Sequence, residues 1–351
     1  MPDVDINLYS DTQSRPTPDM RRAMAEAEVG DEQRGQDPTV NALCERTAAL
    51  LGQEAAIFLP SGTMCNQIGM TVHCRPGDEV IADETAHVVN VEGAGAAALA
   101  GASIRPIRGR RGVFGPEQVH EAVRTRSRYA PRSRLVVVEN TANLGGGTVW
   151  SLEEVKAVAA AAGERGLALH MDGARLLNAV VASGTAAADY AAPFDSVWID
   201  LSKGLGCPVG AVLAGSADFI DQALDHKHRL GGAMRQAGII AAAGLYALDH
   251  HVDRLATDHA NAARFAALTT QVEGISVDLE GVQSNMVYLD VAGTGLDGAA
   301  FNARCQERGV DLCPMGGSSI RVVTHLDVSS DQVDRAAAVV AEVAGEAVAA
   351  R

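Results

Sequence analysis

One stretch decides the fold: Asp195-Ser-Val-Trp-Ile-Asp-Leu-Ser-Lys203-Gly-Leu-Gly206, in which a mostly apolar run ends on a lysine followed by glycines. Val197, Trp198 and Ile199 favour a pleated, covered surface, so the run is expected to form a buried strand. Lys203 then lies where the sheet ends, which is where open α/β sheets bind their ligands. Partial burial favours the neutral amine, the nucleophilic form of a lysine. On this motif alone, a lysine that only ends a strand with its head in water remains an alternative.

Strands and helices alternate on both sides of this stretch. Apolar runs predict strands over 55–59, 80–82, 104–107, 135–138, 167–171, 197–201 and 211–213. Amphipathic, alanine-rich patterns such as Leu152–Ala162 predict helices between them. This alternation predicts an α/β fold with a mainly parallel, doubly wound sheet.

The pattern changes after Gly232. Long helices are expected over 235–273, followed by strands over 286–291 and 320–324 and helices over 296–308 and 330–349. We therefore expect a large domain over residues 1–247, which includes an N-terminal arm, and a small C-terminal α+β domain over residues 248–351.

Composition narrows the class of protein. The 351 residues carry a formal net charge of −15, which argues against partners such as nucleic acids or anionic membranes. The six cysteines include no C-x-x-C pair and are expected to be reduced. The first residues lack the basic and apolar regions of a signal peptide, and no run of about eighteen apolar residues occurs. A soluble, cytoplasmic protein is expected.

Two further motifs place polar groups at predicted strand ends. Ser61-Gly62-Thr63 follows a strand and opens a helix, whose free N–H groups can receive a phosphate. Asp172 ends another strand and can pair with a protonated ring nitrogen, while Arg175 offers a fork that matches a carboxylate. Taken singly, the first is an ordinary helix start and the second a structural ion pair. A phosphate cradle, an acid for a pyridinium and the Lys203 amine are together what pyridoxal phosphate requires.

Histidines add one candidate to this set. His87 follows a predicted strand, where an imidazole can lie over a cofactor ring or move a proton near neutral pH. His226 and His228 lie two residues apart and do not share a helix face, so they are expected in an exposed basic turn. No metal site is expected.

The sequence closely resembles the L-threonine aldolases of low specificity, within the aspartate-aminotransferase-like (fold type I) pyridoxal-phosphate enzymes. The resemblance covers essentially the whole chain. Its matching stretches are Ser10–Thr12, Ala27–Asp31, Asp37–Asn41, Leu59–Met64, Glu139–Thr141, His170–Arg175, Leu201–Gly206, Met234–Gly238 and Ile320–Asp327.

The resemblance implies a role for each matched site residue. Lys203 would bind the cofactor covalently, Asp172 would pair with its pyridine nitrogen, and His87 would stack on its ring and transfer protons. Phosphate contacts would come from Ser61, Gly62, Thr63 and Arg235, and substrate-carboxylate contacts from Ser10, Arg175 and Arg321. The resemblance also implies a homotetramer, a dimer of dimers with active sites at the dimer interface.

The implied activity is cleavage of L-β-hydroxy-α-amino acids, such as threonine, allo-threonine or phenylserine, to glycine and an aldehyde. A β-eliminating lyase of the same fold would instead release ammonia and a 2-oxo acid. A transaldolase that passes the glycyl carbanion to a second aldehyde, and a non-catalytic protein of this fold, are further alternatives.

Two positions depart from the family pattern. Arg34 stands where a tyrosine is usual, and Ala142 stands where a histidine usually follows Glu-Asn-Thr. We therefore hypothesise a modified side-chain pocket, widened at Ala142 or suited by Arg34 to an anionic substrate. The alternative is that Arg34 points to solvent or into a subunit contact.

Overall fold

The structure is a computed structural model that describes residues 4–350. The chain divides into a large unit, Pro16–Val252, and a small unit that combines residues 4–15 with residues 253–350. None of the helices in these described residues is both long enough and apolar enough to cross a membrane.

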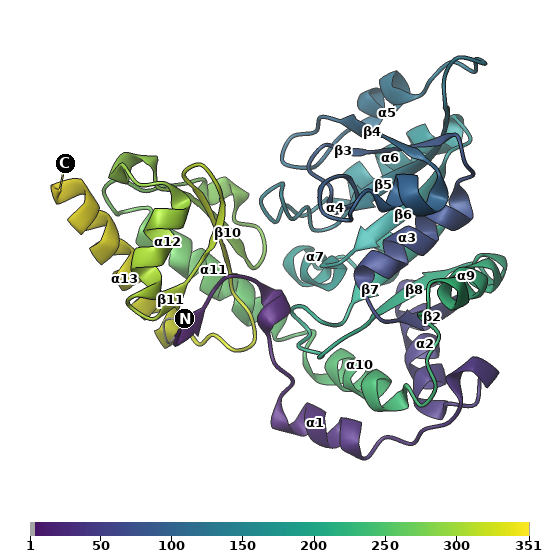
Figure 1. Cartoon of the computed structure of the whole chain (residues 1–351), viewed down its shortest axis with the longest axis horizontal. Coiled ribbons are helices and arrows are strands. Elements are labelled where there is room, and N and C mark those ends of the chain that lie inside the picture. Colours follow the sequence, from purple (N-terminus) through teal and green to yellow (C-terminus); the bar gives the residue numbers. More distant parts are fainter. Residues whose placement is uncertain (1–3, 351) are drawn as a thin grey trace. The chain divides into compact units, whose positions relative to one another are not determined.

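A seven-stranded sheet forms the centre of the large unit (Figure 1). Its strands, in spatial order, are β2 (Ala55–Leu59), β8 (Ala211–Gly215), β7 (Ser196–Asp200), β6 (Ala168–Gly173), β5 (Arg132–Glu139), β3 (Asp78–Asp83) and β4 (Ser103–Ile107). The strands from β7 to β4 are parallel, and β8 runs antiparallel to both of its neighbours. The predicted mainly parallel α/β sheet is confirmed, and every strand predicted for it is present.

Helices surround this sheet. They are α1 (Pro18–Ala25), α2 (Pro38–Leu51), α3 (Gly62–His73), α4 (His87–Asn90), α5 (Pro116–Ala122), α6 (Leu152–Glu164), α7 (Leu176–Ser183), α8 (Ala187–Ala191), α9 (Ala217–Arg229) and α10 (Gly238–His250). Helix α1 packs on α10. One core cluster joins α3 and α9 to alternate residues of β2, such as Ile57 and Leu59. Helix α10 packs closely on Leu43 of α2 and on Leu201, since a Cβ atom on its Gly244 would lie 2.9 Å from Leu43 and 3.0 Å from Leu201.

The direction of the strands brings several chain segments to one edge of the sheet, which we call the carboxyl edge. Strand β2 runs the same way as β7, because Leu59 and Asp200 both pair with Ala211 of the antiparallel β8. The ends of β2, β3, β5, β6 and β7 therefore share this edge. Across it, Glu139 lies beside Asp172, and Asp172 lies beside Trp198.

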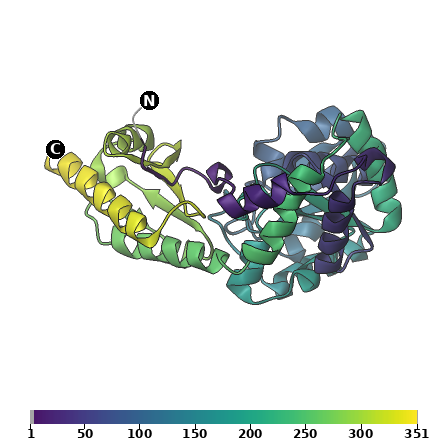
Figure 2. The same cartoon turned by 90° about the horizontal axis from the view of Figure 1, so that it is seen from below.

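The small unit has its own sheets and core. Its strands are β1 (Ile6–Asn7), β9 (Ser276–Val277), β10 (Met286–Asp290), β11 (Val310–Asp311), β12 (Cys313–Gly316) and β13 (Ser319–Val323). They form an antiparallel sheet in the order β12-β13-β10-β9 and a parallel β1–β11 pair. Helices α11 (Leu255–Thr269), α12 (Gly298–Gln306) and α13 (Ser330–Ala349) pack on them, and α11 lies beside α13 (Figure 2). Phe265, Phe301 and Val340 are buried in this core.

The units divide differently from the predicted domains. The division falls between Val252 and Asp253 rather than after residue 247, because the expected long helix is interrupted between α10 and α11. Residues 4–15 belong to the small unit rather than to the large one, because β1 pairs with β11.

The expected exposed turn at residues 226–228 is wrong. These residues lie in α9, where only His228 is exposed. Lys227 is buried and forms an ion pair with Glu32. Burial lowers the pKa of Lys227 to about 8.

Candidate active site

Lys203 lies just past the end of β7, at the carboxyl edge. Its Nζ atom is 2.9 Å from Oδ2 of Asp200 and 5.7 Å from the ring centroid of Trp198. The Lys203 side chain is 15% exposed, so the amine is half-buried, as the sequence predicted.

Asp172 ends β6 beside this lysine and is 1% exposed. Its Oδ1 atom accepts a hydrogen bond from the Ala174 amide at 3.0 Å, and its Oδ2 atom accepts one from Nδ2 of Asn66 at 2.7 Å. Burial raises the pKa of Asp172, and the charges of His87 and Lys203 and the Asn66 hydrogen bond oppose this rise.

His87 opens α4, and two buried acids hold it. Its Nδ1 atom lies 2.8 Å from Oε1 of Glu92, and its backbone N–H donates to Oε2 of Glu139 at 2.6 Å. Burial lowers the pKa of His87, but the Glu92 hydrogen bond and the nearby carboxylates outweigh it and raise the pKa above its usual value. Burial, reinforced by the charge of Asp172, raises the pKa of Glu139 to about 7.

The predicted phosphate-binding residues lie at the start of α3. Oγ of Ser61 caps the helix by accepting from the Met64 amide at 3.2 Å, and Thr63 is exposed in the first turn. A Cβ atom on Gly62 would lie 2.2 Å from the Trp198 ring. Only glycine therefore fits where the helix starts against this indole.

Three predicted arginines of the large unit lie in different surroundings. Arg175 is 5% exposed and precedes α7, three residues after Asp172. Arg235 is exposed and forms an ion pair with Asp31 at 3.1 Å. Arg34 is exposed at the end of a short 3-10 turn, Glu32–Arg34. The ligand roles of all three arginines stay predictions.

The small unit brings Ser10 and Arg321 together. Nη2 of Arg321 donates to the backbone oxygen of Tyr9 at 3.3 Å, so the guanidinium lies beside the chain that carries Ser10. Oγ of Ser10 accepts from the Thr12 amide at 3.2 Å. Both side chains are less than a tenth exposed. Their predicted role in binding a carboxylate stays a prediction.

Ala142 is buried beside two glycines. Ala142 is 3% exposed, and a Cβ atom on Gly112 would lie 2.6 Å from its Cβ atom. A Cβ atom on Gly145 would lie 3.0 Å from it. Ala142 therefore packs closely against these two glycines, and a pocket widened at this position stays a prediction.

Sequence reasoning missed the groups that hold the predicted residues in place. No local pattern indicates a role for Asn66 or His170, and Glu139 stands out only within a stretch that resembles the family. Glu92 is an isolated acid in a run of alanine and glycine, which was the available signal for it. A lone buried acid in such a run requires a partner, and here it has His87 and Asn66.

Among the described residues, three side chains of this cluster lie close enough together to hold a metal ion. His87, Glu92 and Asp172 offer ligand atoms within 4.8 Å of one another. Nδ2 of Asn66, however, donates to both carboxylates, at 2.6 Å for Glu92 and 2.7 Å for Asp172. An N–H group pointing at both acids repels a cation, so the geometry favours a hydrogen-bond cluster.

Comparison with known proteins identifies the family. The profile of the beta-eliminating lyase family matches residues 7–292. The chain belongs to this family. The chain is 40% identical over 334 residues to the low specificity L-threonine aldolase of Escherichia coli K12, covering 95% of this chain and 97% of that one.

Two further comparisons agree. The low-specificity L-threonine aldolase 1 of Arabidopsis thaliana is 38% identical over 333 residues, which cover 93% of each chain. The solved structure of the Leishmania major threonine aldolase superposes with a TM-score of 0.82 at 22% identity, covering 97% of this chain and 99% of that one. At that identity the superposition supports the fold alone, which is fold type I.

Pyridoxal phosphate is the cofactor of this family and fold, and the residues of this chain fit it. The buried acids Asp172, Glu92 and Glu139 gather at the carboxyl edge with one histidine and one lysine, and a protonated pyridine nitrogen would offset this excess of negative charge. Lys203 offers the amine, and the cradle at Gly62 offers backbone N–H groups for a phosphate.

Proposed function

We propose that this chain is a pyridoxal-phosphate-dependent aldehyde-lyase that cleaves L-threonine and related L-β-hydroxy-α-amino acids to glycine and an aldehyde. The observation that carries this proposal is the meeting of Lys203, Asp172 and the start of α3 at one edge of the sheet. The extensive identity to low-specificity L-threonine aldolases supports the choice of reaction.

Each site residue has a proposed task. Lys203 binds the cofactor aldehyde covalently, and Asp172 holds the ring nitrogen through a carboxylate oriented by Ala174 and Asn66. Phosphate contacts come from Ser61, Gly62, Thr63 and Arg235. Ser10, Arg175 and Arg321 bind the substrate carboxylate and so decide which bond at Cα stands perpendicular to the ring. When bound, the pyridinium ring withdraws electrons from that bond.

His87 is proposed to move the proton of the substrate hydroxyl. Its Nδ1 atom faces the Glu92 carboxylate, which accepts a hydrogen, so Nδ1 carries the proton of the neutral ring. Nε2 is then the free base. Glu92 also stabilises the charged imidazolium that forms when Nε2 accepts the hydroxyl proton.

The proposed substrate range depends on where Arg34 lies in the assembled protein. Arg34 is exposed in the single chain, so a preference for anionic side chains would require Arg34 to face a site in an assembly. We propose a homotetramer, a dimer of dimers with its sites at the dimer interface, in the cytoplasm. Sedimentation equilibrium of the purified protein is expected to give four times the mass of one chain.

A covalent-labelling experiment tests the assignment of the cofactor site. Purified protein incubated with pyridoxal phosphate is expected to turn yellow, and borohydride reduction is expected to fix the cofactor on the peptide that contains Lys203. The variant Lys203→Ala should retain no label. A label on another lysine would contradict the proposed site.

β-Elimination is the second candidate function, because the family profile carries that description. It requires removal of the Cα proton and loss of a group at Cβ. Product analysis separates the two reactions, since elimination yields ammonia and a 2-oxo acid instead of glycine and an aldehyde.

A further inference from the structure

A buried chain of polar side chains crosses the large unit between α3 and the sheet. It runs from His73, through Ser196 and His170, to Asn66 and Asp172. Helix α3 lies so close to β6 here that a Cβ atom on Gly69 would be 2.6 Å from the His170 ring. Apart from His73, each member is at most 1% exposed, although most polar side chains avoid such places.

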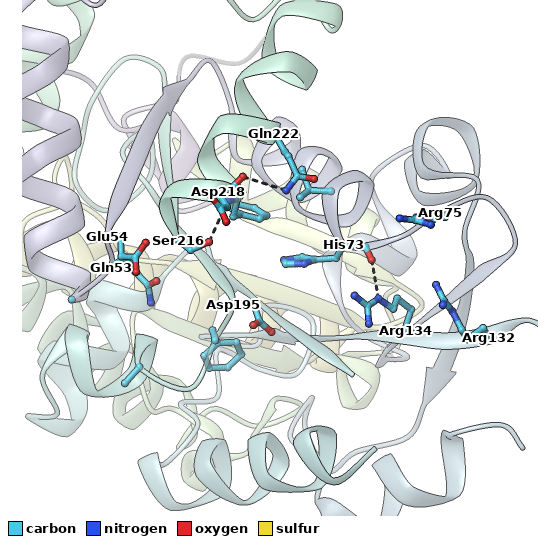
Figure 3. A pocket seen from close by; sticks show the side chains of 15 residues that line it. Gln53, Glu54, His73, Arg75, Arg132, Arg134, Asp195, Ser216, Asp218 and Gln222 are labelled. Carbon is cyan, nitrogen blue, oxygen red and sulfur yellow. Dashed lines mark hydrogen bonds between the residues drawn. The ribbon is translucent and has the colours of Figure 1, made fainter. Parts of the chain in front are cut away.

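The outer end of this chain lies at the edge of the sheet opposite the carboxyl edge. His73 lines an open cavity of about 840 Å³ there, with Arg134 donating to its backbone oxygen at 3.2 Å (Figure 3). The inner end reaches the candidate active site. The hydrogen bonds therefore join the two edges of the sheet along one helix.

The indole of Trp198 fixes the orientation of the Asn66 amide at the inner end of this hydrogen-bonded chain. Nε1 of Trp198 donates to Oδ1 of Asn66 at 2.7 Å, and an indole N–H can only donate. The acceptor oxygen of Asn66 therefore faces Trp198, and its Nδ2 faces the carboxylates of Asp172 and Glu92. Both of its hydrogens are used, one on each acid.

The same logic assigns the histidine tautomers. Nε2 of His170 lies 3.1 Å from Oδ1 of Asn66 and must donate to it. Nδ1 of His170 then accepts from the Ser196 hydroxyl at 2.8 Å, and Ser196 accepts from Nε2 of His73 at 2.7 Å. Burial lowers the pKa of His170 to about 3 and that of His73 to about 4, so both rings are neutral near pH 7.

Asn66 thereby joins two acids that have different tasks. Asp172 is the acid for the cofactor ring, and Glu92 holds the Nδ1 atom of His87 and also accepts from Gln67. The other charged or titratable groups that face this cluster are Glu139, Asp200, Lys203 and Cys65. Without a donor between them, the carboxylates of Asp172 and Glu92 would repel each other and move apart.

We propose that Asn66 is a positioning residue, whose side-chain amide holds Asp172 against the cofactor ring and Glu92 against His87, in an orientation fixed by Trp198 and His170. This inference rests on the proposed cofactor-dependent function. It adds that one amide sets the geometry of the ring acid and the histidine base together.

The first test replaces the amide. The variant Asn66→Met removes both donors, and the cofactor dissociation constant is measured by titrating the apo-protein with pyridoxal phosphate. We expect binding to weaken about tenfold or more, because a buried acid loses its donor. The kcat for threonine should fall by a similar factor, with KM changed less than about threefold, because the substrate-carboxylate contacts are intact.

The matched control is Asn302→Met in the small unit. Asn302 is also a buried asparagine that donates to a carboxylate, that of Asp311 at 3.1 Å. Its replacement should leave the cofactor dissociation constant unchanged. A control that weakens cofactor binding as much as Asn66→Met would overturn the proposal, since a general loss of stability would then explain both.

A second pair of variants tests the orientation and covers the case in which Asn66→Met does not fold. His170→Leu removes the donor to Oδ1 of Asn66 and is expected to weaken cofactor binding several-fold. His170→Gln can accept from Ser196 and donate to Asn66, so it should restore binding to within about twofold of the wild type. Equal binding by wild type and His170→Leu would contradict the proposal. Wild-type apo-protein that takes up no pyridoxal phosphate would instead overturn the proposed function itself.

Discussion

Gly62 is the residue of the proposed phosphate cradle at which the structure leaves no room for a side chain. Any side chain at this position would enter the Trp198 ring, since its Cβ atom would lie 2.2 Å from the indole. Gly62→Ala should therefore lower the free energy of unfolding by about 1–3 kcal/mol, as overpacking does, and reduce cofactor uptake. Urea unfolding and pyridoxal-phosphate titration measure the two effects.

Gly163 provides the matched control. It lies in α6, is exposed, and its added Cβ atom would meet nothing within 4 Å. Gly163→Ala should raise the free energy of unfolding by about 0.5–1 kcal/mol, because alanine loses less conformational freedom in a helix. If both substitutions lowered the free energy of unfolding, or both raised it, the explanation given for Gly62 would be contradicted.

Helix α3 packs against the sheet over the buried His170, so the free energy of unfolding should depend on pH. The folded-state pKa of His170, about 3, lies below the unfolded value of 6.5, so the unfolded chain binds the proton first. The contribution of neutral His170 is complete above pH 6.5 and is lost as pH falls towards 3. When the pH is lowered from 7 to 4.5, the free energy of unfolding of the wild type should fall by about 2–3 kcal/mol more than that of His170→Gln.

Urea unfolding of the apo-proteins at the two pH values checks this prediction. His228→Gln is the control, because His228 is exposed on the same unit and outside the α3 contact. It should lose as much stability on acidification as wild type does. Identical losses for wild type and His170→Gln would show that the ring is not buried in its neutral form.

The strands differ in how well the sequence alone could predict them. Strands such as β7 and β8 were predictable, because each is a short, mostly apolar run in which every residue is buried. The pairs of short strands in the small unit were missed, since β1, β9 and β11 have only two residues each. Lys227 was expected to be exposed, because nothing local signals its buried partner Glu32, which lies far away in the sequence.

For the whole molecule, the positions of the proposed site residues at strand ends could be predicted, and the groups that hydrogen-bond to them could not. Lys203, Asp172 and His87 stand out because a polar group follows a buried run. Asn66 and Glu92 gain their roles only when α3 and the turn after α4 pack against β6. Tertiary contacts of this kind leave no periodic signal in the sequence.

The products formed from L-threonine test the central claim most directly. The holoenzyme is predicted to release glycine and acetaldehyde in equal amounts, and Lys203→Ala is predicted to release neither. Formation of ammonia and a 2-oxo acid in place of glycine and acetaldehyde would contradict the proposed aldehyde-lyase activity.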